Sequence, residues 1–203
     1  MNHPGKLAQG YLGLVAFSLA GSALSQATGL DPGPIAPIAS GLTILVGLAA
    51  VFRASQRDRS IQLAAVGVLL LGAAVEVVGL ETGFPFGYYA YTERWQPTVP
   101  VLGHPFPVLL PFAWLLVSGA AFFVAVRWVG GSIGAVPAAA AIATAVDVPM
   151  EWTMAGGLRY WVWLERGPLP GGAPVANLLG WFGTSLLASL IFYLGGAAKR
   201  RGK

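Results

Sequence analysis

Six apolar stretches dominate the sequence, and each is about as long as a membrane-crossing helix. A helix needs about 20 apolar residues to span the hydrocarbon core of a bilayer. Charged residues make up only 10% of the chain, whereas a soluble domain carries about a quarter. We therefore predict an all-α fold, a polytopic membrane helix bundle that forms a single integral membrane domain over residues 1–203. The six stretches are Leu7–Ala27, Pro34–Phe52, Ser60–Leu80, Pro105–Trp128, Ser132–Met150 and Pro174–Ala197.

The positive charges predict how these about six transmembrane helices are oriented. Lys and Arg gather on the cytoplasmic side of membrane proteins. On one side of the predicted bundle lie Lys6, Arg53, Arg57, Arg59, Arg127, Lys199, Arg200, Arg201 and Lys203; on the other lie only Arg94, Arg159 and Arg166. We therefore expect a multi-pass protein of the cell membrane with both termini cytoplasmic. Lys6 and Ala23-Leu24-Ser25 leave open that the first stretch is a cleaved signal peptide.

Composition excludes several functions. The chain has no Cys, which excludes disulfides and thiolate catalysis. His3 and His104 are too few for a histidine-rich iron centre, and no Gly cluster matches a phosphate-binding loop. The net charge of +4 follows from the basic cytoplasmic side, so it does not indicate nucleic acid. We expect no metal, no organic cofactor and no nucleic-acid partner.

Acidic residues inside apolar stretches are the first candidates for function. Glu76 and Asp147 lie sixteen and fifteen residues from the cytoplasmic starts of their stretches, so both reach a depth of about 22–24 Å. Glu151 follows Asp147 by four residues and shares its helix face, and Pro149 between them should bend the helix. A charge at such depth costs about 3 kcal/mol, which suggests a functional role. The alternative is a hydrogen bond to a neighbouring helix.

Two other polar residues lie near the same end of the bundle. Asn177, at the outer start of the last stretch, is a further polar group in an apolar setting, although a helix cap or a packing hydrogen bond would also explain it. Glu81 is a further candidate, or an ordinary interfacial residue.

Aromatic residues crowd the two long outer links, Glu81–His104 and Glu151–Ala173. Neither link has a helical or strand period, so we predict loops, with Gly83–Gly87 turning the chain so that rings cover the acids. Interfacial belts of Trp and Tyr are common and account for Trp95 and Trp128. The remaining rings are candidates for substrate binding: Phe84, Phe86, Tyr88, Tyr89, Tyr91, Trp114, Tyr160, Trp161, Trp163 and Trp181.

Buried carboxyls beside aromatic rings suit acid-catalysed chemistry on an alkene. Low dielectric disfavours the carboxylate anion, so a buried carboxylic acid can donate a proton near neutral pH. A second carboxyl can activate water. Ring faces stabilise a nearby cation by roughly 0.5–2 kcal/mol each. The pattern therefore predicts protonation of an apolar alkene and a carbocation that water or a base then quenches.

Five motifs carry a resemblance to a known family. TGFPFGYYAYT (Thr82–Thr92), PFAW (Pro111–Trp114), DVPME (Asp147–Glu151), YWVW (Tyr160–Trp163) and PVANLLGW (Pro174–Trp181) occur in this order. Together they resemble the carotenoid 1,2-hydratases, membrane enzymes that act on γ-carotene, lycopene or bisanhydrobacterioruberin. The resemblance implies a hydro-lyase that adds water across the terminal 1,2 double bond of an acyclic carotenoid end. It implies carotenoid and water as ligands, with other enzymes of the pathway as candidate partners.

The hypothesis assigns a role to each candidate. Asp147 is the general acid that protonates C2, Glu151 or Glu76 activates the water, and Asn177 holds the water or the new hydroxyl. The acid and base roles are interchangeable at this stage. Two rival functions remain: a carotenoid cyclase or isomerase, which ends by losing a proton, and a small proton-coupled transporter that uses Glu76 and Asp147 as a relay.

Overall fold

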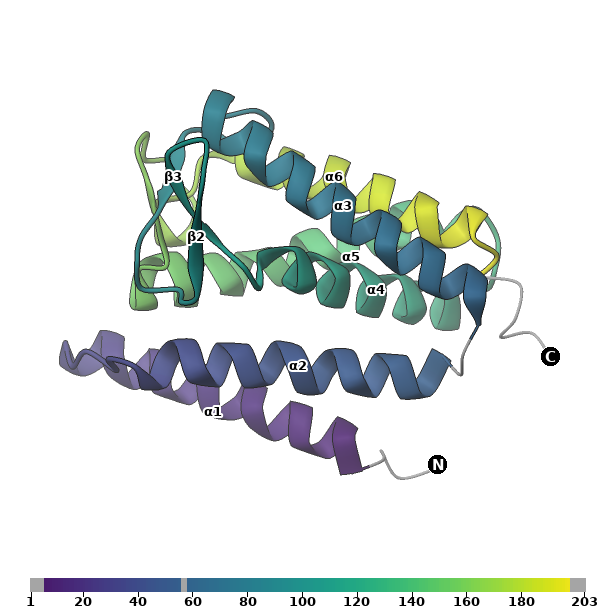
Figure 1. Cartoon of the computed structure of the whole chain (residues 1–203), viewed down its shortest axis with the longest axis horizontal. Helices are drawn as coiled ribbons and strands as arrows, with labels where there is room; N and C mark the ends of the chain where they lie inside the picture. Colours follow the sequence, from purple (N-terminus) through teal and green to yellow (C-terminus); the bar gives the residue numbers. More distant parts are fainter. Residues whose placement is uncertain (1–5, 56–57, 198–203) are drawn as a thin grey trace.

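The computed structural model describes residues 6–55 and 58–197, and most of them are helical (Figure 1). The helices are α1 (Lys6–Thr28), α2 (Ile35–Ser55), α3 (Arg59–Thr82), α4 (Leu110–Val129), α5 (Ala135–Met150), the π-helix η1 (Glu151–Leu158), the short 3₁₀-helix η2 (Pro170–Gly172) and α6 (Val175–Leu194). The strands are β1 (Tyr89–Tyr91), β2 (Thr98–Val101), β3 (His104–Pro107) and β4 (Trp161–Trp163).

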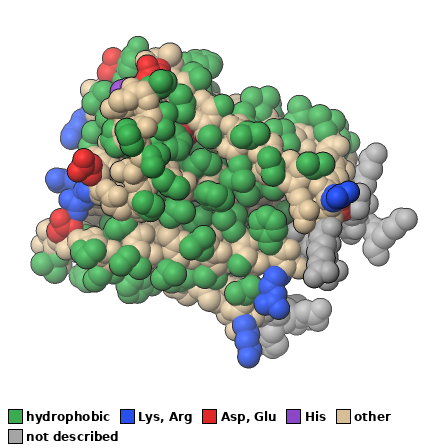
Figure 2. All heavy atoms as spheres, viewed as in Figure 1, with side chains coloured by type: hydrophobic (Ala, Val, Ile, Leu, Met, Phe, Trp, Pro, Cys, Tyr) green, Lys and Arg blue, Asp and Glu red, His purple; other side chains and the backbone are tan. Residues whose placement is uncertain are grey.

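Four helices in the described part of the chain are long and apolar enough to cross a membrane: Ile35–Arg53 of α2, α3, α4 and α6. They coincide with four of the six predicted stretches, and α1 and α5 lie over the other two. Figure 2 shows apolar side chains over the middle of one face, with charged side chains towards its ends. The chain is therefore a helical membrane protein. The predicted start of the fourth stretch at Pro105 is wrong, because 104–107 pair as a strand and the helix begins at Leu110.

Figure 1 shows one bundle of α3, α4, α5 and α6, with the α1–α2 hairpin alongside. The hairpin is attached through α2 against α4 and α1 against η1. α1 begins and α6 ends at the same end of the bundle, and the strands lie at the opposite end. Five of the basic residues used for the predicted orientation lie outside the described residues: Arg57, Lys199, Arg200, Arg201 and Lys203.

Helix α3 has a defined stop at each end. At its start, the Asp58 side chain accepts a hydrogen bond from the backbone N–H of Ser60 at 3.0 Å, as an N-cap does. At its end, Gly83 adopts a left-handed conformation with φ of 73° and donates its N–H to the carbonyl of Gly79 at 2.8 Å. The predicted turn after α3 is confirmed here, and it directs the following residues back across the end of the bundle.

Small residues bring the helices close together at the level of the acids. A Cβ on Gly72 of α3 would lie 2.8 Å from the Cβ of Trp114 on α4, so only glycine fits there. On α5, Ala139, Ala140 and Ala143 are fully buried, and this helix packs against both α4 and α6. Close backbone approach through small residues is the usual way in which membrane helices associate.

The two outer links differ from the predicted loops, because short strands form in both. β1 pairs with β4 and β2 pairs with β3, each pair antiparallel. The predicted all-α fold therefore lacks the small layer of β-strands that the structure has at the outer end of the bundle. Strands of three and four residues give too few alternations to stand out in a sequence.

Candidate functional site

The β1–β4 ribbon places four hydrogen-bond donors on one face. Tyr89 pairs with Trp163 and Tyr91 with Trp161, while Ala90 pairs with Val162 between them. Alternate residues of a strand point to the same side, so the two tyrosines and two tryptophans face the bundle together. All four are at most 8% exposed, whereas Val162 on the other face is 42% exposed.

Glu76 of α3 accepts hydrogen bonds from three buried aromatic side chains. Its Oε2 accepts from the hydroxyls of Tyr89 at 2.6 Å and Tyr91 at 2.9 Å. Its Oε1 accepts from the indole N–H of Trp114 on α4 at 2.7 Å. The carboxyl group is buried, with Glu76 only 5% exposed. Donors from the ribbon and from α4 thus fix its position.

The two phenols that hold Glu76 remain donors over a wide pH range. Burial raises the pKa of Tyr89 and of Tyr91 above the usual 10, and the charge of Glu76 raises both further. Both hydroxyls therefore keep their protons at neutral and moderately alkaline pH, and each can donate a hydrogen bond to the Glu76 carboxyl group throughout that range.

A second carboxyl group, that of Glu151, is held on the same face of the ribbon by donors from β4. Its Oε2 accepts from the indole N–H of Trp163 at 2.9 Å and of Trp161 at 3.3 Å. Its Oε1 accepts from the amide of Asn177 at 3.2 Å, and the same amide nitrogen donates to Oδ2 of Asp147 at 2.7 Å. Asn177 therefore bridges two buried carboxyl groups. The other oxygen of Asp147, Oδ1, is buried without a hydrogen-bond partner.

The change of helix type at Met150 explains how Glu151 reaches the ribbon. Pro149 has no backbone N–H to donate inside α5, and the chain continues as the π-helix η1 from Glu151. The hydroxyl of Thr153 donates back to the Pro149 carbonyl at 2.9 Å. The predicted disturbance at Pro149 thus takes the form of a wider helical turn, a feature frequent at functional sites.

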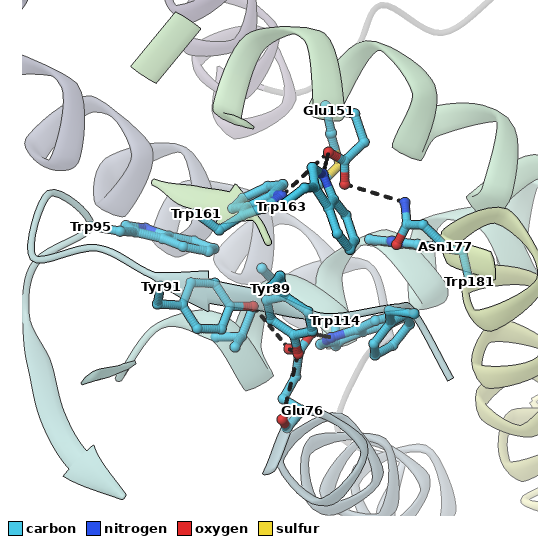
Figure 3. A pocket seen from close by; sticks show the side chains of 14 residues that line it. Glu76, Tyr89, Tyr91, Trp95, Trp114, Glu151, Trp161, Trp163, Asn177 and Trp181 are labelled. Atoms are coloured by element: carbon cyan, nitrogen blue, oxygen red, sulfur yellow. Dashed lines mark hydrogen bonds between the residues drawn. The ribbon is translucent and has the colours of Figure 1, made fainter. Parts of the chain in front are cut away.

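The two glutamates line one cavity of about 50 Å³. Figure 3 shows Glu76 on one side and Glu151 with Asn177 on the other, with the rings between them. One water occupies about 30 Å³ of liquid, and a cavity that accepts benzene measures about 150 Å³. The cavity therefore has room for water and is smaller than one that accepts benzene. Its lining residues are Glu76, Phe86, Tyr89, Tyr91, Trp95, Leu110, Ala113, Trp114, Met150, Glu151, Trp161, Trp163, Asn177 and Trp181.

Most of the predicted site residues meet at this cavity, but five do not line it. The alternation of β1 and β4 turns Tyr88 and Tyr160 away from the cavity, and Phe84 in the turn is 72% exposed. Glu81 lies at the end of α3, where its carboxylate is 3.2 Å from the ring nitrogen of His104. The carboxyl group of Asp147 does not line the cavity and is linked to its residues by the hydrogen bond from Asn177.

Sequence reasoning missed several residues of the lining. The sequence predicts an interfacial belt position for Trp95, yet this residue is 2% exposed and its ring lies 6.2 Å from those of Tyr91 and Trp161. Trp95 lies four residues after Tyr91 and outside strand β1, so the alternation of the strand does not predict that its ring faces the cavity. Leu110, Ala113 and Met150 are also in the lining, and nothing distinguishes them from other apolar helix residues.

The donor set does not match a metal centre. No group of three or more His, Cys, Asp or Glu side chains able to hold a metal ion occurs within residues 6–55 and 58–197. The carboxyl groups instead accept hydrogen bonds from indole, phenol and amide groups.

The fold and the site define a helical membrane protein with paired buried carboxyl groups in an aromatic cavity. A family model described as "Carotenoid biosynthesis protein" matches residues 38–201. The chain belongs to this family, which indicates a role in carotenoid metabolism. The match covers every residue that lines the cavity. No curated protein and no solved structure matches the chain significantly.

Proposed function

We propose that the protein is a carotenoid hydratase that adds water to the terminal 1,2 double bond of an acyclic end group. The observation that carries the proposal is the pair of glutamates on opposite sides of one small aromatic cavity. Hydration of an unactivated alkene needs one group that gives a proton and another that takes one. It also needs stabilisation of the cation between these steps, and the cavity supplies all three.

The acid in this proposal is the Asp147–Glu151 pair, with Glu151 delivering the proton. The sequence hypothesis gave the acid role to Asp147. The support for Glu151 is that it lines the cavity, whereas Asp147 is joined to it through the Asn177 amide. Two carboxylates at one buried site repel each other, and Oδ1 of Asp147 is buried without a partner. A proton held by one of the two carboxyl groups removes the repulsion between two negative charges and lowers the cost of burying Oδ1 of Asp147 without a partner.

The proposed reaction has two steps. The Glu151 carboxyl gives its proton to C2, the π electrons of the double bond form the new C–H bond, and a tertiary cation remains at C1. A water in the cavity then forms a C–O bond to C1 and loses a proton to Glu76. The substrate gains one water, and the proton on Glu76 returns to Glu151 by way of water in the cavity before the next turnover. The indole and phenol rings of Trp114, Trp161 and Tyr89 lie around the cation, where their faces stabilise positive charge.

The proposed placement in the membrane follows the same geometry. We infer six crossings, with the ribbon and the cavity near the non-cytoplasmic surface and both termini in the cytoplasm. The positive-inside rule supports this orientation, as does the beginning of α1 and the end of α6 at the same end of the bundle. The end of a long polyene would then meet water close to the interface.

Expression in a host that makes lycopene or γ-carotene tests the function. We expect pigments that are heavier by one or two waters, with labelled oxygen after growth in ¹⁸O water. A cyclase would leave the mass unchanged and a transporter would leave the pigment unaltered. Absence of hydroxylated product from every acyclic carotenoid would refute the proposal.

Glu151→Gln tests the acid within the same assay. Because glutamine cannot donate an acidic proton, we expect turnover to fall by about 10²–10⁴-fold, the usual contribution of acid–base catalysis. Glu165→Gln is the matched control, since Glu165 lies exposed in the same link and should leave turnover unchanged. Equal turnover of the two variants would remove the acid role from Glu151.

A further inference from the structure

A second hollow, which we call the α2 groove, lies beside the cavity and has a volume of about 730 Å³. Its floor is one face of α2, including Ile38, Gly41, Leu42 and Leu45, which follow each other at helical spacing. From Ala36 to Leu45 this face extends for about 14 Å along the helix axis, about half the thickness of the hydrocarbon core.

The charged residues of the groove gather at one end. Asp31, Glu93 and Arg94 line it there, and the Arg94 guanidinium forms an ion pair with the Asp31 carboxylate. This pair joins the α1–α2 link to the β1–β2 link. The α2 face is apolar and large parts of it are exposed, with Ile38 at 62% and Leu45 at 56%. The groove therefore suits a long apolar molecule whose end lies near the polar surface.

The wall between the groove and the cavity is one residue thick. At three places the chain passes from one hollow to the other between consecutive residues, the first of which lines the groove and the second the cavity: Arg94 and Trp95, Leu109 and Leu110, and Tyr160 and Trp161. The rings of Trp95 and Tyr160 stack in this wall with centroids 5.3 Å apart and planes 10° apart. The Tyr160 hydroxyl is also within 3.0 Å of the hydroxyl of Ser40 on α2.

We propose that the α2 groove holds the polyene chain of a linear carotenoid, and that its end group reaches the glutamates by parting the Trp95–Tyr160 stack. This inference rests on the proposed function. The cavity of about 50 Å³ is smaller than the roughly 150 Å³ that accommodates benzene, so an isoprenoid end needs additional space. The groove supplies it directly across the stacked pair. A phospholipid acyl chain or a second copy of the protein is the competing occupant.

Single-cysteine labelling tests the occupant directly, because the natural chain has no Cys. A bimane fluorophore is attached at Leu42→Cys in the groove, and at Leu70→Cys as control. Leu70 is 67% exposed on α3 and does not line the groove. Each protein is reconstituted into phosphatidylcholine vesicles with increasing amounts of lycopene. We expect saturable quenching at position 42, and at position 70 only the linear quenching of random collisions.

Three results would overturn the inference. Linear quenching at both positions would mean that the groove is ordinary lipid-facing surface. Saturable quenching at position 42 by brominated phospholipid but not by lycopene would mean an acyl chain. Protection of the label from both quenchers would mean a protein contact. Leu45→Cys repeats the test on the same face if a label at position 42 disturbs folding.

Turnover separates failure of the groove from failure of the proposed function. Leu42→Trp, which fills the groove, should raise the KM for lycopene by about tenfold, equivalent to losing the burial of about two methylene groups. It should leave turnover of a ten-carbon terpene with the same end group unchanged, because that substrate is too short to use the groove. Equal effects on both substrates would contradict the groove. If wild type hydrates neither substrate, the proposed function fails, and the labelling result still decides the groove.

Discussion

Glu76→Gln removes one negative charge from the cavity and keeps the shape of the side chain. In the proposed reaction a cation forms inside the cavity between Glu76 and Glu151. A sphere of 50 Å³ has a radius of about 2.3 Å, and adding atomic radii places a carbon at its centre about 5 Å from the Glu76 oxygens. At that distance, and at an effective dielectric constant of about 20, one charge stabilises the cation by about 3 kcal/mol. Turnover should therefore fall by about 10²–10³-fold.

The same substitution should change stability much less than activity. The variant loses the charge assistance in three hydrogen bonds, those from Tyr89, Tyr91 and Trp114, which is worth about 1 kcal/mol in each. It also no longer buries a charge, which returns a cost of several kcal/mol. Because these two effects oppose each other, we expect the melting temperature to move by only a few degrees.

Single-turnover kinetics in lipid nanodiscs, with the hydroxylated product separated by chromatography, measures the effect on the chemical step. Glu81→Gln is the control on the same helix, since Glu81 pairs with His104 outside the cavity, and it should behave as wild type. A folded Glu76→Gln protein that turns over within about threefold of wild type would refute the electrostatic reasoning.

Two further predictions concern packing and the phenols. Gly72→Ala places a methyl group 2.8 Å from Trp114 and should lower the free energy of unfolding by about 1–3 kcal/mol, measured by thermal unfolding in detergent. Gly13→Ala, which has open space around it, should not destabilise, and equal melting temperatures for the two variants would contradict the close contact. The raised pKa values mean that Tyr89 and Tyr91 stay protonated in the folded protein above pH 10, whereas they ionise when unfolded, so stability should fall as the pH rises beyond about 10. Replacing both by Phe should leave the phenolate absorbance of the folded protein unchanged at alkaline pH, and a loss of absorbance would show that they ionise.

The common depth of the acidic side chains in the bundle was predictable because it depends on helix geometry alone. Counting residues from the cytoplasmic ends places Glu76 and Asp147 at one depth through the fixed rise of the α-helix. Glu151 and Asn177 then follow from their positions near the outer ends of their helices. A polar side chain in a span must also turn from lipid to the bundle interior. Depth and polarity together are sufficient to bring these groups to one site.

The pairing of the outer links was not predictable in the same way. Tyr89–Tyr91 and Trp161–Trp163 are separated by 69 residues and each strand is only three residues long. Their register is set by contacts that a single sequence does not record. The π-helix was not predictable either. The i, i+4 spacing of Asp147 and Glu151 predicts a shared face only in an α-helix, and the wider turn of η1 changes the direction in which Glu151 points. For this reason the sequence alone does not distinguish Glu151 from Asp147 as the residue that lines the cavity.

The β1–β4 ribbon donates hydrogen bonds to both glutamate carboxyl groups, so it positions the two together. β1 supplies two donors to Glu76 and β4 supplies two to Glu151, and the two strands are hydrogen-bonded to each other. A shift of one residue by either strand would turn the two donors of that strand to the opposite face, so the carboxyl group that they serve would lose both partners. The two groups on which the proposed proton transfers depend therefore share one positioning element. The donors of both groups are therefore oriented by a hydrogen-bonded strand pair and not by a flexible loop.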